Sequence, residues 1–260
     1  MTVFLNNLPA RFAVVASLVL ATWVGLCADA RAQDPVAQPI LLNMSTNGFA
    51  PYTYFDADQA PRGIVYDVAN RVLKKIGYSL TTTEVPRKRV EFQMMAGDLD
   101  ATPRAIEWTD HASDFVFSDP IILVRSALIV RANSHFTTAK ALMGHRIGTR
   151  LGYVYTVLTQ ELESGQLIRS DTNSDLSMLK MLQVQRTDAV LIDEVIARWL
   201  FLREGITDLR VLPESIDNGV QLRLMFAPRH RALVKDFNRE LANLKRSGEL
   251  AAITAHYIGR

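Results

Sequence analysis

Residues that usually mark metal, redox or nucleophilic chemistry are scarce in this chain. Its 260 residues include one cysteine, which excludes a disulfide scaffold, a multi-cysteine zinc site and an iron–sulfur cluster. Nucleophile-elbow, phosphate-loop and dinucleotide-binding glycine motifs are absent. The five histidines have no metal-ligand spacing; they are His111, His135, His145, His230 and His256. We therefore expect no metal, no cofactor and no catalytic nucleophile.

An excess of one charge is also missing. The chain has 29 basic and 27 acidic side chains, for a formal net charge of +2. Proteins that bind nucleic acid through bulk electrostatics have a clear excess of basic residues, so no nucleic-acid partner is expected. Hydrophobic residues make up 48% and charged residues 22%, which is ordinary for a globular protein. This composition argues against wholesale disorder, collagen and coiled coil.

The apolar run near the amino terminus is short. It extends from Phe12 to Leu26, whereas a membrane-spanning helix needs about 20 residues. Arg11 precedes it, and small residues two apart follow it, which is the layout of a secretory signal peptide. We predict a signal peptide over 1–32, with cleavage after Ala32 or Ala30 and a periplasmic location for the product.

Two alternatives to a cleaved signal remain. One is an uncleaved membrane anchor, and the other is a lipid anchor on Cys27. Leu26 directly precedes this cysteine, where lipoprotein signals need a small residue, and this argues against the lipid anchor. If the signal is cleaved, the mature chain begins near Gln33, contains no cysteine and has a fold that does not depend on redox state.

Short apolar strands and amphipathic helices alternate from Pro39 onward. Gly63 precedes a helix whose apolar positions follow the i, i+3, i+4, i+7 spacing of one buried face, namely Val65, Val68, Ala69, Val72, Leu73 and Ile76. Strands are predicted at 40–44, 80–85 and 99–105, with a short helix at 90–95.

A second series begins near Ser126. Strands are predicted at 127–131, 146–150 and 189–192, and helices at 138–143, 153–162 and 194–203, with a further helix capped by Ser174. A late strand at 222–226 leads into a long helix and a last short one. Strands alternating with helices predict an α/β protein built on parallel sheet, and two successive series indicate two lobes.

Six short segments follow one another in a defined order. They are GFAPY at 48–52, GIVYDV at 63–68, AGDLDA at 96–101, FSDP at 117–120, RTDAVLID at 186–193 and LANLKRSG at 241–248. In this order and spacing they resemble the bacterial extracellular solute-binding proteins of family 3, the polar amino-acid receptors of ABC importers. The resemblance covers nearly the whole chain after the predicted signal peptide.

The resemblance implies a type 2 periplasmic binding fold: two α/β lobes joined by two crossing strands, with the ligand cleft between them. The crossings are expected near 119–125 and 217–221. Lobe 1 is then expected over 36–120 and 222–260, and lobe 2 over 124–218. Closure around the ligand is a hinge motion in such proteins.

The resemblance also implies a ligand site. The position of the arginine that binds the ligand carboxylate in this family is His111, which is mostly neutral at pH 7. Asp193 matches the aspartate that takes the ligand ammonium, and Phe49 matches an aromatic wall of the cleft. Gly152 and Tyr153 match the turn that binds the carboxylate. Tyr153 is expected to open a helix whose amide end favours an anion.

Three arginines give this site an unusual charge. Arg87 falls near the position of the second aromatic wall, Arg104 falls where the family has small residues beside the ligand, and Arg150 ends a predicted strand. They predict a carboxylated ligand. In the alternative interpretation, Arg104 and Arg87 pair with Glu107 or Glu84 and do not contact ligand.

Two other candidates have structural alternatives: Asp193 as a helix-start carboxylate and Phe49 as core packing. The expected ligand-binding set is Phe49, Tyr52, Arg87, Arg104, Glu107, His111, Arg150, Gly152, Tyr153 and Asp193.

The leading functional hypothesis is a monomeric receptor that captures a small polar solute, an amino acid or related carboxylate, and delivers it to an inner-membrane ABC permease. A second hypothesis uses the same fold as the sensory input of a signalling membrane protein. A third is an enzyme, because a dehydratase for cyclic dienyl acids is built on this fold, with Glu107 or His111 as the only candidate acids. We expect a binding protein and no enzyme.

Overall fold

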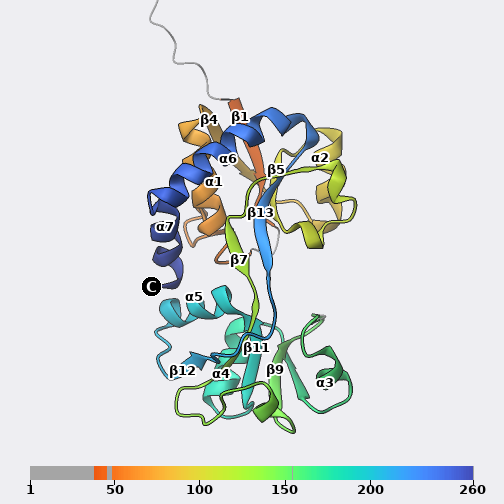
Figure 1. Ribbon diagram of the computed structural model, residues 1–260, viewed down its shortest axis with the longest axis vertical. Coiled ribbons are helices and arrows are strands. Elements are labelled where there is room, and N and C mark those ends of the chain that lie inside the picture. Colours follow the sequence, from red (N-terminus) through yellow and green to blue (C-terminus); the bar gives the residue numbers. More distant parts are fainter. Residues whose placement is uncertain (1–37, 46–48, 154, 260) are drawn as a thin grey trace, which may run out of the picture. The chain divides into compact units, whose positions relative to one another are not determined.

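The computed structural model describes residues 38–45, 49–153 and 155–259. The signal peptide predicted over 1–32 lies outside these residues and stays a prediction. Two sheets, each with its own helices, make up the described chain (Figure 1).

The first sheet has the strand order β4-β1-β5-β13-β6, with β7 paired to β13. We call this sheet and its helices lobe 1. Its strands are β1 (Gln38–Asn43), β4 (Tyr78–Thr83), β5 (Ala101–Arg104), β6 (Val116–Phe117), β7 (Ile122–Val124) and β13 (Val220–Phe226). Its helices are α1 (Ile64–Lys75), α2 (Val90–Ala96), α6 (Arg231–Arg246) and α7 (Glu249–Ile258). A small hairpin of β2 (Tyr54–Phe55) and β3 (Pro61–Arg62) precedes α1.

The second sheet has the order β10-β9-β11-β8-β12 and forms lobe 2 with three helices. Its strands are β8 (Ser126–Arg131), β9 (Arg146–Arg150), β10 (Ile168–Thr172), β11 (Ala189–Asp193) and β12 (Leu209–Val211). The helices are α3 (Thr159–Glu163), α4 (Asp175–Gln183) and α5 (Glu194–Glu204).

The amphipathic pattern after Gly63 is confirmed as α1. The apolar positions Val65, Val68, Val72 and Leu73 are fully buried in the core of lobe 1. Two lysines occupy the last turn, where cations complement the negative end of the helix dipole.

Both sheets are mixed, whereas the sequence predicted parallel sheet. β1 pairs in parallel with β4 and β5, but β13 runs antiparallel to β5, and β8 runs antiparallel to β11. The chain leaves lobe 1 along β7, continues directly into β8 and returns along β13. The strands that continue these two passages, β8 and β13, therefore run antiparallel to their neighbours in the two sheets.

The two passages between the lobes lie side by side. β7 pairs antiparallel with the first half of β13, with Val124 opposite Val220. Gly219 precedes this pair with a φ of 67°, and a Cβ there would lie 2.6 Å from the carbonyl oxygen of Val124. Only glycine fits so close an approach of the two passages.

Alternation along β8 supplies the two faces of lobe 2. Ala127 and Ile129 pack into a core with residues of α4 and α5, whereas Leu128 and Val130 pack into a core on the other face of the sheet. Successive side chains of a strand point to opposite faces, so a sheet buried on both sides needs a continuous apolar run.

The helix predicted over 153–162 is wrong in extent, because α3 covers only Thr159–Glu163. The segment before it is rich in aromatic and β-branched residues, which have low helix propensity. It folds back instead, and the Tyr155 hydroxyl accepts a hydrogen bond from the backbone N–H of Arg150 at 2.8 Å. The helix predicted over 138–143 is likewise only a short 3₁₀ turn, Lys140–Leu142.

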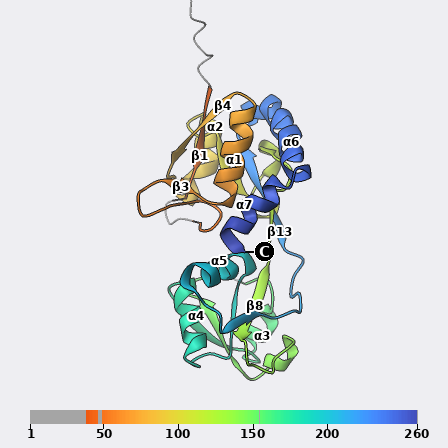
Figure 2. The same ribbon diagram turned by 90° about the vertical axis from the view of Figure 1, so that its left-hand side faces the viewer.

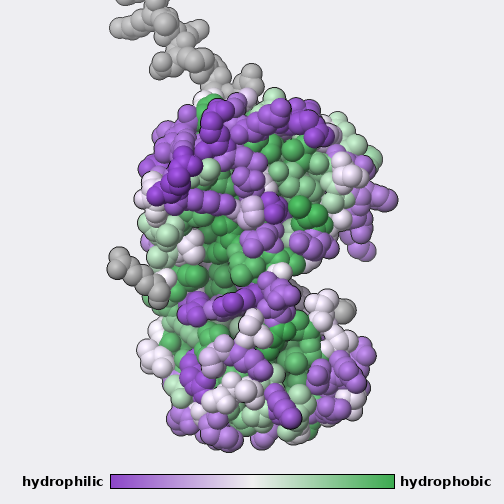
Figure 3. Space-filling model, viewed as in Figure 1, coloured by the Kyte–Doolittle hydropathy of each residue, from purple (hydrophilic) through white to green (hydrophobic). Residues whose placement is uncertain are grey.

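The lobes also meet away from the crossing strands. Figures 1 and 2 both show α7 of lobe 1 next to α5 of lobe 2. In the face drawn in Figure 3, hydrophilic residues form a band at the level of α5. Glu194, the first residue of α5, accepts hydrogen bonds from Arg125 and Arg198 on its two carboxylate oxygens, at 2.6 and 2.8 Å. Burial acts to raise the pKa of Glu194, but these hydrogen bonds hold it below its usual value.

Candidate functional site

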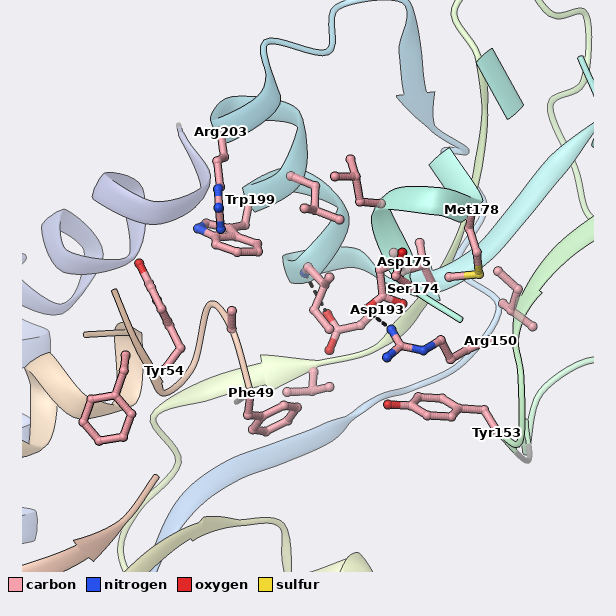
Figure 4. A pocket seen from close by; sticks show the side chains of 18 of the residues that line it. Phe49, Tyr54, Arg150, Tyr153, Ser174, Asp175, Met178, Asp193, Trp199 and Arg203 are labelled. Carbon is pink, nitrogen blue, oxygen red and sulfur yellow. Dashed lines mark hydrogen bonds and ion pairs between the residues drawn. The ribbon is translucent and has the colours of Figure 1, made fainter. Parts of the chain in front are cut away.

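A cavity of about 1040 Å³ is lined by residues of both lobes and by Val124 of β7 (Figure 4). Lobe 1 contributes residues that include Phe49, Tyr54 of β2, Glu84 and Trp108. Lobe 2 contributes Arg150 and Asp193 at the ends of β9 and β11, Tyr153 after β9, Asp175 at the beginning of α4, and Trp199 and Arg203 further along α5. Strand ends and helix starts meet here because parallel neighbours end at one edge of a sheet, and ligands of open α/β sheets bind at that edge.

Asp193 lies at the end of β11 and caps α5. Its Oδ1 accepts hydrogen bonds from the backbone N–H groups of Val195 and Ile196, at 2.8 and 3.3 Å. Its Oδ2 accepts a hydrogen bond from the Tyr52 hydroxyl at 2.7 Å. Burial raises the pKa of Asp193 to about 6, although these three hydrogen bonds lower it. The carboxylate is therefore both a helix cap and a cavity wall, so the two interpretations of this residue are compatible.

Tyr52 reaches Asp193 from lobe 1 and is fully buried. Its ring packs on Phe49 with ring centroids 4.6 Å apart. Its carbonyl oxygen accepts from the backbone N–H of Val65 at 2.9 Å. Gly63 permits this approach, because its φ is 123° and a Cβ there would lie 2.3 Å from the Tyr52 carbonyl oxygen. Burial and the charge of Asp193 raise the pKa of the Tyr52 hydroxyl, which keeps it a donor.

Arg150 is engaged within lobe 2. Its Nη1 forms an ion pair with Asp175 Oδ2 at 2.9 Å, and its guanidinium lies 5.5 Å from the centroid of the Tyr153 ring. Figure 4 shows both Arg150 and Tyr153 at the cavity, with Asp175 beside the guanidinium. The positive charge of Arg150 is thus largely balanced before any ligand binds.

Arg87 and Arg104 line a neighbouring cavity of about 270 Å³ in lobe 1, which shares Phe49 and Trp108 with the larger one. Arg87 donates to Glu91 Oε1 at 2.9 Å, one helical turn along the chain. This pairing differs from the Glu84 or Glu107 partner considered from the sequence.

Arg104 is the unusual residue of this group. Its Nε is buried without a hydrogen-bond partner, and it forms no ion pair with any described residue. Burial, together with the charge of Arg87, lowers the pKa of Arg104 to about 10. The guanidinium is therefore still charged at neutral pH, and pairing with Glu84 or Glu107 does not occur among the described residues.

The remaining candidates are Glu107, His111, Gly152 and Tyr153. Glu107 and His111 are exposed and line none of the three cavities described for this chain, the third being a small one beside α7. Gly152 lies in a turn with a φ of 77°. Tyr153 lines the large cavity and is 57% exposed, but it does not open a helix, since α3 begins at Thr159. The expected helix amide end at this turn is therefore wrong.

Sequence reasoning missed several wall residues. Trp199 of α5 packs on Tyr54 of lobe 1 with ring centroids 5.8 Å apart, and the Arg203 guanidinium lies 5.0 Å from the Trp199 ring centroid. Asp175 balances Arg150 from the first turn of α4. Both Trp199 and Asp175 read as ordinary helix residues in the sequence, so no local signal marks them.

Two α/β lobes, two antiparallel passages between them and a cavity lined by both lobes define a two-lobed type 2 periplasmic binding fold. The family model of bacterial extracellular solute-binding proteins, family 3, matches residues 42–260, and the chain belongs to this family. A search of curated proteins found no match. Members of the family are extracellular or periplasmic receptors and are generally not enzymes.

Solved structures share the fold at low sequence identity. The L-cystine receptor of Neisseria gonorrhoeae in its unliganded open conformation has 17% identity and a TM-score of 0.73, covering 88% of this chain and 96% of that one. A polar amino-acid uptake binding protein of Streptococcus thermophilus has 21% identity and a TM-score of 0.73, covering 85% and 86%. The open second substrate-binding domain of Lactococcus lactis GlnP has 20% identity and a TM-score of 0.71, covering 87% and 97%.

No helix of the described residues is both long enough and apolar enough to cross a membrane. Within the same residues, no group of three or more histidine, cysteine, aspartate or glutamate side chains is arranged to hold a metal ion.

Proposed function

We propose that this protein is a periplasmic receptor that captures a small carboxylated solute between its lobes and delivers it to an ABC importer. The observation that carries the proposal is Arg104, a half-buried arginine beside the cleft that forms no ion pair with any described residue. A buried charge without a partner is costly, and proteins retain such groups where a ligand completes them. A ligand carboxylate accepts charge-assisted hydrogen bonds from a guanidinium.

The wall of the large cavity has the complementary charge. Asp193 and Asp175 both line the large cavity, and Arg150 balances only one of these carboxylates. The layout suits a zwitterion with its carboxylate toward Arg104 and its ammonium toward Asp193. An amino acid or a closely related molecule is therefore the proposed ligand class, with Phe49 and Trp108 as walls shared by the two cavities.

A thermal-shift screen of the mature protein tests the ligand class, because a ligand that binds only the native state raises the melting temperature. Amino acids, dicarboxylates, polyamines and sugar acids form the panel. We expect stabilisation by a carboxylated compound. Stabilisation by a polyamine alone would contradict the proposal and would assign the binding to the acidic wall.

Export and delivery follow from the predicted signal peptide and the family. Mass spectrometry of the secreted protein should show a chain that begins near Gln33 and carries no lipid. Permease and ATPase genes beside the coding sequence would support transport, whereas a signalling gene in their place would support a sensory role.

A further inference from the structure

We infer that Tyr52 is a positioning residue for the cationic group of the ligand: from lobe 1 it holds the Asp193 carboxylate of lobe 2 in a fixed orientation at the cavity wall. The inference rests on the proposed function, in which Asp193 receives the ligand ammonium. It adds a residue that does not itself line the cavity and that joins the two lobes.

The first step is the number of hydrogen bonds that Asp193 accepts. Two backbone N–H groups of α5 bind Oδ1, and the Tyr52 hydroxyl binds Oδ2. An ionised carboxylate has about four acceptor positions, so about one remains free, on Oδ2. Because both oxygens are held, the carboxylate cannot rotate, and its free acceptor position points in one fixed direction. A ligand N–H that meets it loses little freedom on binding.

The second step is the rigidity of Tyr52. Its side chain is fully buried, and its backbone is bonded to the start of α1 at a contact that requires glycine at 63. A buried hydroxyl without a partner is unfavourable, so Tyr52 keeps its bond to Asp193 wherever the lobes allow it. Lobe 1 thus orients the acidic group of lobe 2, and the site for the cation depends on contact between the lobes.

The third step is the charge around Asp193. Asp175 of α4 raises the pKa of Asp193, and its own charge is balanced by Arg150 of β9. Glu194, the next residue, is paired with Arg125 and Arg198. The Tyr52 hydroxyl favours the ionised form by donating to it. Without this donor, the pKa of Asp193 should rise. As the pH is lowered, Asp193 should then be protonated, and an ammonium ligand released, at a higher pH than in wild type.

The test compares pairs of probes that differ in the α-amino group: L-glutamate with glutarate, L-ornithine with 5-aminopentanoate, and L-phenylalanine with 3-phenylpropionate. Calorimetry measures each pair on wild type and on Tyr52→Phe. We expect Tyr52→Phe to weaken the affinity for the member with the α-amino group about tenfold, in any pair that binds. The affinity for the member without the α-amino group should change by less than about twofold. On acidification, the pH at which the affinity for the member with the α-amino group falls to half should be higher in Tyr52→Phe than in wild type.

Tyr257→Phe is the matched control. Tyr257 is also buried and donates its hydroxyl proton to an aspartate, Asp67 Oδ2, but it does not line the large cavity. It should leave the ratio of the two affinities unchanged. In an Asp193→Asn background, Tyr52→Phe should also leave this ratio unchanged. The ratio does not depend on the fraction of folded protein, so partial unfolding of a variant does not obscure it.

Equal weakening of both members by Tyr52→Phe, or no weakening of either, would overturn the inference while leaving the proposed function intact. Failure of all six probes to bind wild type would overturn the proposed function and the inference with it. An unchanged pH midpoint in Tyr52→Phe would also contradict the inference.

Discussion

The two lobes differ in how they leave their charged groups at the cleft. Lobe 2 pairs Arg150 with Asp175 and gives Asp193 three hydrogen bonds. Lobe 1 leaves the buried Nε of Arg104 without a hydrogen-bond partner among the described residues. This comparison indicates that the ligand is better predicted from the charged groups without a partner than from the total number of charged groups at the cleft. By that criterion we propose Arg104 as the anchor for the ligand and Arg150 as a part of the wall.

The largest effects are expected where the lobes are alike. Phe237 of α6 and Leu179 of α4 are both fully buried, one in each lobe. Phe237→Ala should lower the free energy of unfolding by about 3–5 kcal/mol and Leu179→Ala by about 2–5 kcal/mol, because each leaves a cavity. Denaturant unfolding measures both. A loss below about 1 kcal/mol in only one lobe would show that the cores are not equivalent.

The next effect separates the two arginines. Arg104→Ala should weaken a carboxylated ligand about 10–100-fold, since a charge-assisted hydrogen bond contributes ~1.5–3 kcal/mol. It should leave the unliganded protein at least as stable as wild type, because an unpaired buried charge is removed. Arg150→Ala should weaken binding less and should lower stability by less than about 1 kcal/mol, as expected for a partly exposed pair.

Calorimetry and thermal unfolding check this difference. Arg239→Ala on α6 is the control, because it removes an exposed arginine paired with Asp236 far along the chain from the cleft residues. Equal losses of affinity in Arg104→Ala and Arg150→Ala would remove the distinction between anchor and wall. Binding within about twofold of wild type for both, and for Arg87→Ala, would refute the arginine anchor altogether.

Titration of Asp193 should make the stability of the protein depend on pH. Its pKa in the folded protein is about 6, above the ordinary value of 3.8, so the folded state holds this proton more tightly than the unfolded chain. Ionising Asp193 therefore costs stability as the pH rises from about 4 to about 6, by on the order of 1–3 kcal/mol. Asp193→Asn should remove this part of the pH profile and weaken ammonium ligands. An unchanged profile of unfolding against pH would mean that Asp193 does not titrate as described.

The smallest expected effect is a change in the radius of gyration of the protein when ligand binds. Since both lobes supply walls of one cavity and meet through β7 and β13, a saturating ligand should bring them closer and reduce the radius of gyration measured by small-angle scattering. Gly219→Ala should hinder this change, because a side chain at 219 meets Val124 and Arg125. An unchanged radius in wild type with binding saturated would count against closure.

The sequence predicted the main strands and helices where they follow from local periodicity, but it did not predict β10 or β12. The apolar face of α1 and the continuous apolar run of β11 are buried as their spacing indicates. It failed over 153–162, where an apolar spacing suited a helix but aromatic and β-branched residues favoured a folded-back loop. Parallel pairing was also overestimated, since strand direction near the passages depends on where the chain crosses.

Residue types at the cleft were visible in the sequence, but their partners were not. Asp193 and Phe49 were found through a resemblance that spans six segments, and both line the large cavity. His111 and Glu107 were drawn from the same resemblance and lie exposed, outside the three cavities. Position in a motif therefore identified the neighbourhood of the cleft more reliably than the role of each side chain.

Local sequence was sufficient for what depends on near neighbours: helix faces and the cap at Ser174. The tertiary structure alone decided that Arg87 pairs with Glu91, that Arg150 pairs with Asp175 and that Arg104 pairs with no described residue. It also brought Tyr52 to Asp193 across 141 positions of chain. An ion pair or hydrogen bond forms only over a few ångströms, and which charges come that close is set by how distant segments pack.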